Sequence, residues 1–179
     1  MVYLFLANGF EEVEALTPLD MLRRAQVPVT TVGIGGEYIC GAHDIVVKTD
    51  ISAADMNFNS LTAVILPGGM PGTLNLEKSD DVQRAIAYAI ENDLTVAAIC
   101  AAPSILGHAG YLKGRKATCF PGFEDDLLGA ELSDVPLVWD GNILTAKGAG
   151  IALDFAFELV KRLASEEKSA EIRGAIQCR

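Results

Sequence analysis

The sequence is poor in the side chains that bind metals and nucleic acids. Its 179 residues include only two histidines, and no two of its four cysteines (Cys40, Cys100, Cys119 and Cys178) form a C-x-x-C pair. Structural zinc sites need several such ligands at short spacing, so we expect no metal site. Lysine and arginine number 14 against 24 acidic residues, which gives a net charge of −10. Because nucleic acids and anionic membranes attract basic surfaces, the sequence predicts neither as a stable partner.

The N-terminus lacks the pattern of a leader or a membrane span. The stretch MVYLFLANGFEEVE has a short apolar run without a basic flank and reaches two glutamates at once. A signal peptide begins with basic residues and a span needs about 20 apolar ones, so we expect neither. Cysteines without a pairing pattern are typical of a reducing compartment, and we expect a cytoplasmic location with free thiols.

The chain also lacks internal repeats, low-complexity segments and proline- or serine-rich linkers. Half of its residues are hydrophobic, which is enough for one sizeable core. We therefore predict a single domain over residues 1–179.

Strand and helix patterns alternate along this domain. Continuous apolar runs, typical of strands buried on both faces, alternate with segments of helical spacing. This order predicts a mostly parallel sheet covered by helices on both faces, with a small hairpin whose turn lies near Gly41–Asp44. The predicted strands are 2–7, 27–34, 61–69, 94–100, 116–120, 136–141 and 142–148, the hairpin is 38–50, and the helices are 11–25, 81–93, 101–109 and 149–165.

Three short motifs follow predicted strands of this sheet. ANGFEE offers acids, PGGMPG offers backbone N–H groups and CAAP offers the thiol of Cys100. Parallel sheets place their chemistry at the carboxyl ends of their strands, so these groups are expected to meet. Cysteine is also among the most buried residue types, and packing alone is the alternative role for Cys100.

The motifs NGFEEVEA, VILPGGMPG, AAICAAP and TAKGAG together resemble the ThiJ/PfpI superfamily, in the branch of bacterial YajL and the parkinsonism-associated deglycase. The four motifs occur in the family's order and spacing through nearly the whole chain. The resemblance implies a flavodoxin-like three-layer sandwich, a homodimer and a cysteine on a tight strand-to-helix turn. It also implies enzymes without a cofactor that act on reactive carbonyls or on glycated thiols and amines, in protection against carbonyl and oxidative stress.

The resemblance assigns a role to individual residues. The family's nucleophile matches Cys100 and its partner acid matches Glu14. The backbone donors that hold an oxyanion match Gly69 and Ala101, and Gly68 shapes their turn.

Other positions depart from the family pattern or carry weaker assignments. Arg24 matches an anion-contacting arginine, whereas a second such arginine is replaced by His43. The histidine that some members place near the thiol is Phe120 here, and the family's GPGT block reads GAGI at 148–151.

The chemistry of a nucleophilic cysteine sets two expectations. A helix N-terminus favours an anion, so the helix after Cys100 is expected to lower the pKa of its thiol from about 8.5. Glu14 would then have to stay protonated beside the thiolate, which reverses the ordinary order of the two pKa values. A carboxyl kept neutral in this way can transfer protons.

Three functions remain open at this stage. The first is a glyoxalase or deglycase in which Cys100 adds to an α-oxoaldehyde such as methylglyoxal and Glu14 moves protons to give a hydroxy acid. The second is a redox sensor or chaperone whose Cys100 is oxidised. The third, a cysteine peptidase or amidase, lacks the histidine that would protonate a leaving amine. The first is the prediction, and it requires neither metal nor cofactor.

Overall fold

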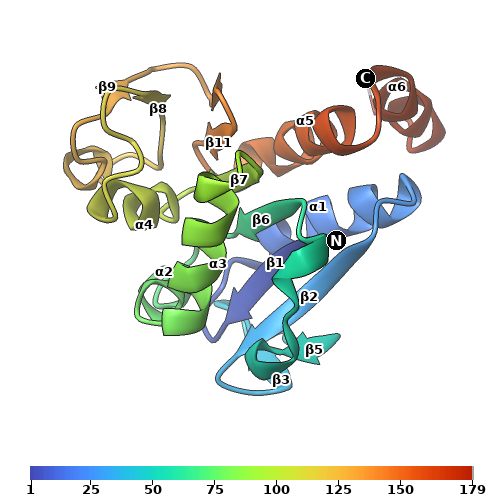
Figure 1. Ribbon diagram of the computed structural model, residues 1–179. Helices are drawn as coiled ribbons and strands as arrows, with labels where there is room; N and C mark the ends of the chain where they lie inside the picture. The colour runs from blue at the N-terminus through green and yellow to red at the C-terminus, as the bar shows by residue number, and fades with distance from the viewer. Residues whose placement is uncertain (179) are drawn as a thin grey trace.

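A seven-stranded sheet forms the middle layer of the computed structural model, which describes residues 1–178 (Figure 1). Its strand order is β10-β11-β7-β6-β1-β2-β5, and β10 alone pairs antiparallel with its neighbour. The strands are β1 (Val2–Ala7), β2 (Val29–Ile34), β5 (Ile51–Ser52), β6 (Ala63–Leu66), β7 (Thr95–Ile99), β10 (Leu137–Asp140) and β11 (Ile143–Ala146).

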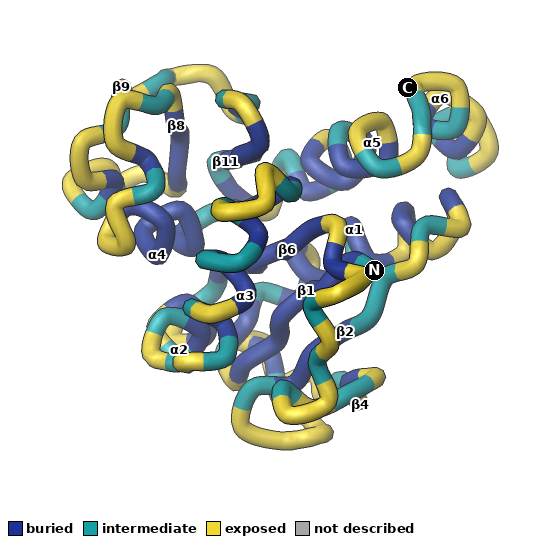
Figure 2. Tube along the Cα trace, viewed as in Figure 1, coloured by how far each residue is buried: buried dark blue, intermediate teal, exposed yellow. Residues whose placement is uncertain are grey.

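The central strands are buried on both faces, as their continuous apolar runs require. Every residue of β1, β6 and β7 is buried, and the middle of the sheet is accordingly dark in Figure 2. Because successive side chains point to opposite faces, each strand feeds two separate cores. Leu4 and Leu6 of β1 join one core, whereas Tyr3 and Phe5 join the other.

Three helices cover each face of the sheet. The first core contains residues of α1 (Glu12–Arg24), α5 (Ala152–Leu163) and α6 (Glu166–Ala175), and the second contains residues of α2 (Gly72–Glu77), α3 (Asp80–Glu91) and α4 (Pro103–His108). Ser79 and Ser165 cap α3 and α6 by accepting hydrogen bonds from the backbone N–H groups three residues on. The result is the predicted three-layer α/β sandwich.

Smaller elements complete the fold outside the main sheet. The hairpin of β3 (Tyr38–Cys40) and β4 (Val46–Lys48) is antiparallel, whereas β8 (Lys116–Ala117) and β9 (Glu131–Leu132) pair parallel. Four 3₁₀ helices are η1 (Ala53–Asp55), η2 (Phe58–Ser60), η3 (Glu124–Asp126) and η4 (Ala149–Ile151). No helix within residues 1–178 is both long and apolar enough to span a bilayer.

The structure confirms the sheet, the hairpin and three of the four predicted helices, and it corrects three other assignments. The strand predicted over 116–120 is two residues long and lies outside the main sheet. The helix predicted over 149–165 begins as η4, and Ser165 starts the separate helix α6, whose polar sequence gave little apolar periodicity. Helix α2 was not predicted, because Pro71, Gly72 and Asn75 are typical of turns.

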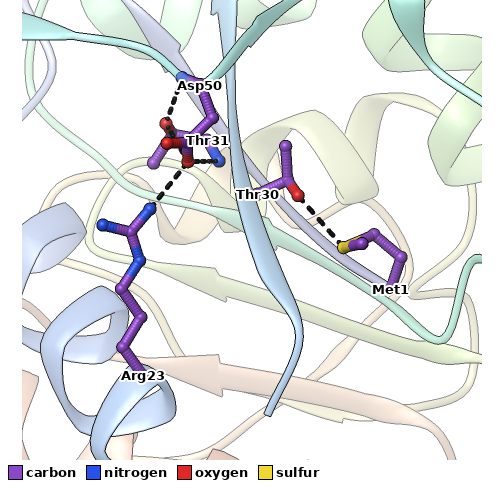
Figure 3. Close-up of polar contacts among 5 residues, drawn as sticks. All are labelled: Met1, Arg23, Thr30, Thr31 and Asp50. Carbon is purple, nitrogen blue, oxygen red and sulfur yellow. Dashed lines mark hydrogen bonds and ion pairs between the residues drawn. The ribbon is translucent and has the colours of Figure 1, made fainter. Parts of the chain in front are cut away.

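Asp50 fastens the edge of the sheet through one carboxylate oxygen (Figure 3). Its Oδ2 accepts hydrogen bonds from the Thr31 backbone N–H and hydroxyl, both at 2.8 Å, and from Arg23 Nη2 at 2.7 Å. Burial opposes ionisation, but the Thr31 hydrogen bonds and the Arg23 charge outweigh it and lower the pKa of Asp50. The carboxylate thus joins the C-terminal end of α1, β2 and the segment before β5.

We expect Asp50→Ala to lower the free energy of unfolding by about 1–2 kcal/mol, because the Thr31 backbone N–H and hydroxyl lose their acceptor. The exposed ion pair with Arg23 contributes little to this loss. A group whose pKa is lowered in the folded state stabilises it above the unfolded value and loses that effect as pH falls through the folded value. The difference between wild type and variant in urea unfolding should therefore be full at neutral pH and shrink below about pH 4. Asp20→Ala, which breaks only the exposed Asp20–Arg24 pair, serves as the control; equal losses in both variants would contradict the role of Asp50.

Candidate active site

Cys100 lies on the turn between β7 and α4, at the carboxyl end of a central strand. Its backbone φ of 65° is in the left-handed region, which costs a non-glycine residue about 1–3 kcal/mol. Neighbouring segments hold it there: its N–H donates to the Ala146 carbonyl and its carbonyl accepts from the Phe120 N–H, both at 2.9 Å. This turn gives the half-buried thiol a fixed direction.

Glu14 faces the thiol from the first turn of α1. Its side chain is only 1% exposed, and it forms a hydrogen bond with the Cys100 side chain. Glu14 Oε2 also accepts a hydrogen bond from the Gly68 N–H at 2.9 Å, and the carboxyl accepts another from the backbone of Ala149. The predicted acid and thiol therefore meet although they are far apart in the sequence.

The glycine pair makes this meeting possible. A Cβ on Gly68 would lie 2.6 Å from the Cβ of Cys100 and 2.7 Å from Glu14 Oε2, so only glycine fits between them. Gly69 has a φ of 89°, which favours glycine. The backbone N–H groups of Gly69 and Ala101 form hydrogen bonds with the Cys100 sulfur. All five residues to which the motifs assigned the main roles are thus brought together.

Burial changes the acid–base properties of both groups. It raises the pKa of Glu14 to about 7, although hydrogen bonds from Cys100, Gly68 and Ala149 act in the opposite direction. Burial and the charge of an ionised Glu14 raise the pKa of Cys100 to about 12, against the N–H groups of Ala101 and Gly69. Because the two groups interact, these values describe the first and the second proton to leave the pair. The pair therefore retains one proton across the range between them.

The expectation that the following helix lowers the pKa of Cys100 is wrong for this chain. Helix α4 begins at Pro103 and is six residues long, so its N-terminus is neither close nor strong enough to outweigh burial. The same burial confirms a raised pKa for Glu14. A thiolate consequently arises when the remaining proton of the pair lies on the Glu14 carboxyl, with the two N–H groups stabilising the sulfur.

The two weaker assignments lie away from the thiol or are engaged elsewhere. Arg24 is ten residues beyond Glu14, about 15 Å along α1, and pairs with Asp20 at 3.0 Å. His43 lies on the β3–β4 turn, where its Nδ1 is 2.8 Å from Glu12 Oε2 and its N–H donates to Glu12 Oε1. Within one copy of residues 1–178, neither contacts the Cys100–Glu14 pair.

Glu11, Glu12 and His43 form the one cluster of metal-ligand type found within the described residues. Glu12 is buried, and burial raises its pKa while hydrogen bonds from His43 outweigh that effect and lower it. The His43–Glu12 contact accounts for the closeness of these side chains.

The sequence did not assign roles to Ala149 and Gly148, which line the pair. Ala149 acts through its backbone, so its side chain carries no signal of the contact. A Cβ on Gly148 would lie 3.2 Å from Phe120 Cδ2 and 3.8 Å from Glu14 Oε1. Phe120 therefore stands close to the site, at the position where some family members have a histidine.

Comparisons with known proteins identify a family and agree with this fold. Residues 1–162 match the DJ-1/PfpI family. Protein dj-1beta of Drosophila melanogaster is 34% identical over 170 residues, covering 93% of this chain and 91% of the relative. Deglycase PfpI of Pyrococcus furiosus is 36% identical over 168 residues, covering 91% of this chain and 99% of the relative.

Solved structures show the same architecture. The crystal structure of Drosophila melanogaster DJ-1beta superposes with a TM-score of 0.93 at 32% identity, covering 99% of this chain and 97% of that one. A cysteine-to-alanine mutant of a DJ-1 superfamily protein from Salmonella typhimurium gives the same TM-score and identity, covering 98% and 97%. Because the family match covers most of its length and the relatives and solved structures agree with it, the chain belongs to the DJ-1/PfpI family.

Proposed function

We propose that the protein is a cofactor-independent cysteine enzyme that converts reactive carbonyls, such as methylglyoxal, to hydroxy acids, as a glyoxalase or deglycase. The observation that carries this proposal is the hydrogen bond between the buried Glu14 carboxyl and the Cys100 thiol, with N–H groups of Gly69 and Ala101 at the sulfur. Relatives from two Pyrococcus species are named deglycases, which supports this class of substrate.

The first step is addition of Cys100 to the aldehyde carbon. The thiol proton passes to Glu14, the sulfur forms a bond to carbon and the carbonyl oxygen becomes negative. The N–H groups of Gly69 and Ala101, which lie at the sulfur, would stabilise this neighbouring oxygen. Return of the proton gives a neutral hemithioacetal.

The second step moves a proton between adjacent carbons. Glu14 as carboxylate removes the proton from the former aldehyde carbon and returns it to the neighbouring carbon, while the hydroxyl proton passes to the neighbouring carbonyl oxygen. The first carbon is thereby oxidised and the second reduced within one molecule. The product is a thioester on Cys100, which water hydrolyses to the hydroxy acid and the free thiol. A carboxyl with a pKa of about 7 is suited to both directions of this transfer.

The peptidase alternative requires an acid for the leaving amine. Both histidines of the chain are occupied elsewhere, His43 with Glu12 and His108 with Glu77 and Asp126. Phe120 stands near the site where a histidine would serve. These contacts favour carbonyl chemistry over amide cleavage.

The resemblance to the family also suggests a homodimer, and one exposed apolar surface suits it. Val13 of α1 and Ile45 and Val46 of the hairpin are each about half exposed, at 47%, 51% and 59%. Burying such side chains against a second copy would remove apolar area from water. That residues 1–179 form a single domain remains a prediction. The four free cysteines are typical of a reducing compartment, and we propose that the protein is located in the cytoplasm.

Oxidation of Cys100 is the second candidate function. The half-buried sulfur has two N–H donors that would also stabilise a sulfinate, and a structural neighbour from Toxoplasma gondii, with 27% identity, is described as oxidised DJ-1.

Mild peroxide should therefore add two oxygens to Cys100 before it modifies the other cysteines. Cys119, which is only 4% exposed, is an internal reference for a thiol that peroxide reaches poorly. Peptide mass spectrometry measures the order; oxidation that reaches Cys119 as fast as Cys100 would leave the sensor function without support.

The pH dependence of Cys100 alkylation tests the shared proton. Once the pair has lost its first proton, the fraction of molecules whose remaining proton lies on Glu14 has a reactive thiolate. Iodoacetamide labelling should therefore begin to rise near pH 7, where Glu14 has its raised pKa. An ordinary thiol has its midpoint near pH 8.5. A labelling rate that does not rise near pH 7 would contradict transfer of the thiol proton to Glu14.

Glu14→Gln tests the proton transfer itself. Glutamine keeps the shape of the side chain but cannot carry a proton, so turnover of methylglyoxal to lactate should fall by about a hundredfold or more. Alkylation of Cys100 should persist, because the N–H groups of Gly69 and Ala101 remain. Glu12→Gln, which changes a neighbouring buried glutamate bound to His43, is the matched control for loss of a buried charge. Full turnover in Glu14→Gln would show that the proton takes another route.

A further inference from the structure

His108 joins the ends of three segments outside the Cys100–Glu14 pair. Its Nδ1 is 2.6 Å from Glu77 Oε1, and its Nε2 is 3.3 Å from Asp126 Oδ1. His108 ends α4, Glu77 ends α2 and Asp126 ends η3. One imidazole thus bridges three elements that are far apart in the sequence.

The same three segments begin at the candidate site. Helix α4 follows Cys100, α2 follows the Gly68–Gly69 turn and η3 follows Phe120. The first turn of α2 holds the glycine turn, since the Thr73 N–H donates to the Gly69 carbonyl at 2.9 Å. These segments are only six, six and three residues long. A displacement at the end of a segment near His108 can therefore move the other end, which lies at the candidate site.

Packing around His108 is tight enough to transmit such a displacement. A Cβ on Gly107 would lie 2.1 Å from the Asp126 carbonyl oxygen, so α4 and η3 are in direct contact. The charged groups that face the imidazole are Glu77 from α2 and Asp126 from η3, and α4 has no other titratable side chain. A protonated imidazole donates to both carboxylates, whereas a neutral one has a single N–H and can donate to only one.

We propose that His108 is a positioning residue whose imidazolium fastens α2 and η3 to α4 and so keeps the Gly69 N–H and Phe120 in place around Cys100. The proposal goes beyond the carbonyl chemistry, because it concerns the geometry of the site for any reaction of Cys100. It also accounts for a histidine that is too far along α4 to act as a base for the thiol.

The proposal carries a definite pH dependence. The hydrogen bond with Glu77 raises the pKa of His108, burial opposes this, and Asp126 adds to it. A group whose pKa is raised on folding contributes fully below its unfolded value, about 6.5 for histidine, and the contribution is lost as pH rises through the folded value. The imidazolium therefore fastens both segments in mild acid, and the neutral imidazole holds only one of them in alkali.

Hydrogen exchange of wild type and His108→Gln tests this without reference to turnover. At about pH 6 the amides of 68–77 and 120–127 should exchange about three- to tenfold faster in the variant, the scale of two partly exposed ion pairs. At about pH 9, where the wild-type imidazole is neutral, the two proteins should exchange alike. Lys161→Gln, which breaks the exposed Lys161–Glu166 pair on the opposite face, should leave these amides unchanged at both pH values.

The alkylation rate of Cys100 should depend on His108 in the same way, differing between wild type and His108→Gln at about pH 6 and not at about pH 9. Glu77→Gln and Asp126→Asn each remove one partner with little change of volume, so each should speed exchange mainly in its own segment, 68–77 or 120–127. These two variants also replace His108→Gln if it does not fold. Equal exchange of wild type and His108→Gln at about pH 6 would overturn the proposal. A difference between the two proteins that is the same at both pH values would also overturn it, because such a difference reflects the size of the side chain and not its charge. Loss of methylglyoxal turnover without these changes would concern the proposed function alone.

Discussion

The contact between the Glu14 carboxyl and the Cys100 thiol depends on burying two ionisable groups against each other. Each is costly to ionise alone inside the protein, so the pair retains one proton over a wide pH range. Backbone N–H groups lower the two pKa values in part, those of Gly68 and Ala149 at the carboxyl and those of Gly69 and Ala101 at the sulfur. Burial, more than the helix dipole, sets the chemistry of the site.

The fold itself buries the pair, because the ends of neighbouring strands and the start of α1 meet around the thiol. Parallel strands β6 and β7 end at the same edge of the sheet, which places the glycine turn and Cys100 side by side. Helix α1 begins after β1, the next strand along, and its first turn presents Glu14 to them. The strained backbone of Cys100 is held by β11 and by the segment around Phe120. Four chain segments are therefore needed to fix one thiol.

The sequence predicted the parts of this arrangement that depend on side-chain pattern. Buried strands and amphipathic helices have a clear apolar period, and Cys100, Glu14 and the glycine pair lie at strand ends where parallel sheets carry their sites. Helix α6 was missed because its residues are polar on most faces, and α2 because its turn-forming residues are recruited into a short helix by packing of Leu76.

Other features of the site depend on three-dimensional contact and leave no local signal. The Ala149 N–H acts through the backbone, and the ion pairs of His108 join residues 31 and 18 positions away. The pKa of Cys100 was predicted in the wrong direction because a strand-to-helix turn indicates a dipole but not the degree of burial. Asp20 is a partner that the i,i+4 spacing to Arg24 indicates. Glu12, the partner of His43, lies 31 positions away and leaves no such signal.

The most direct measurement is a titration of the Glu14 carboxyl by NMR with ¹³C-labelled glutamate, with Glu14→Gln to assign the signal. Burial beside Cys100 predicts a midpoint near pH 7 for this carboxyl, and Cys100→Ala should move that midpoint, because the two groups share a proton. A midpoint near the ordinary value of about 4.3, unchanged by Cys100→Ala, would contradict a coupled pair and with it the proposed route of the proton.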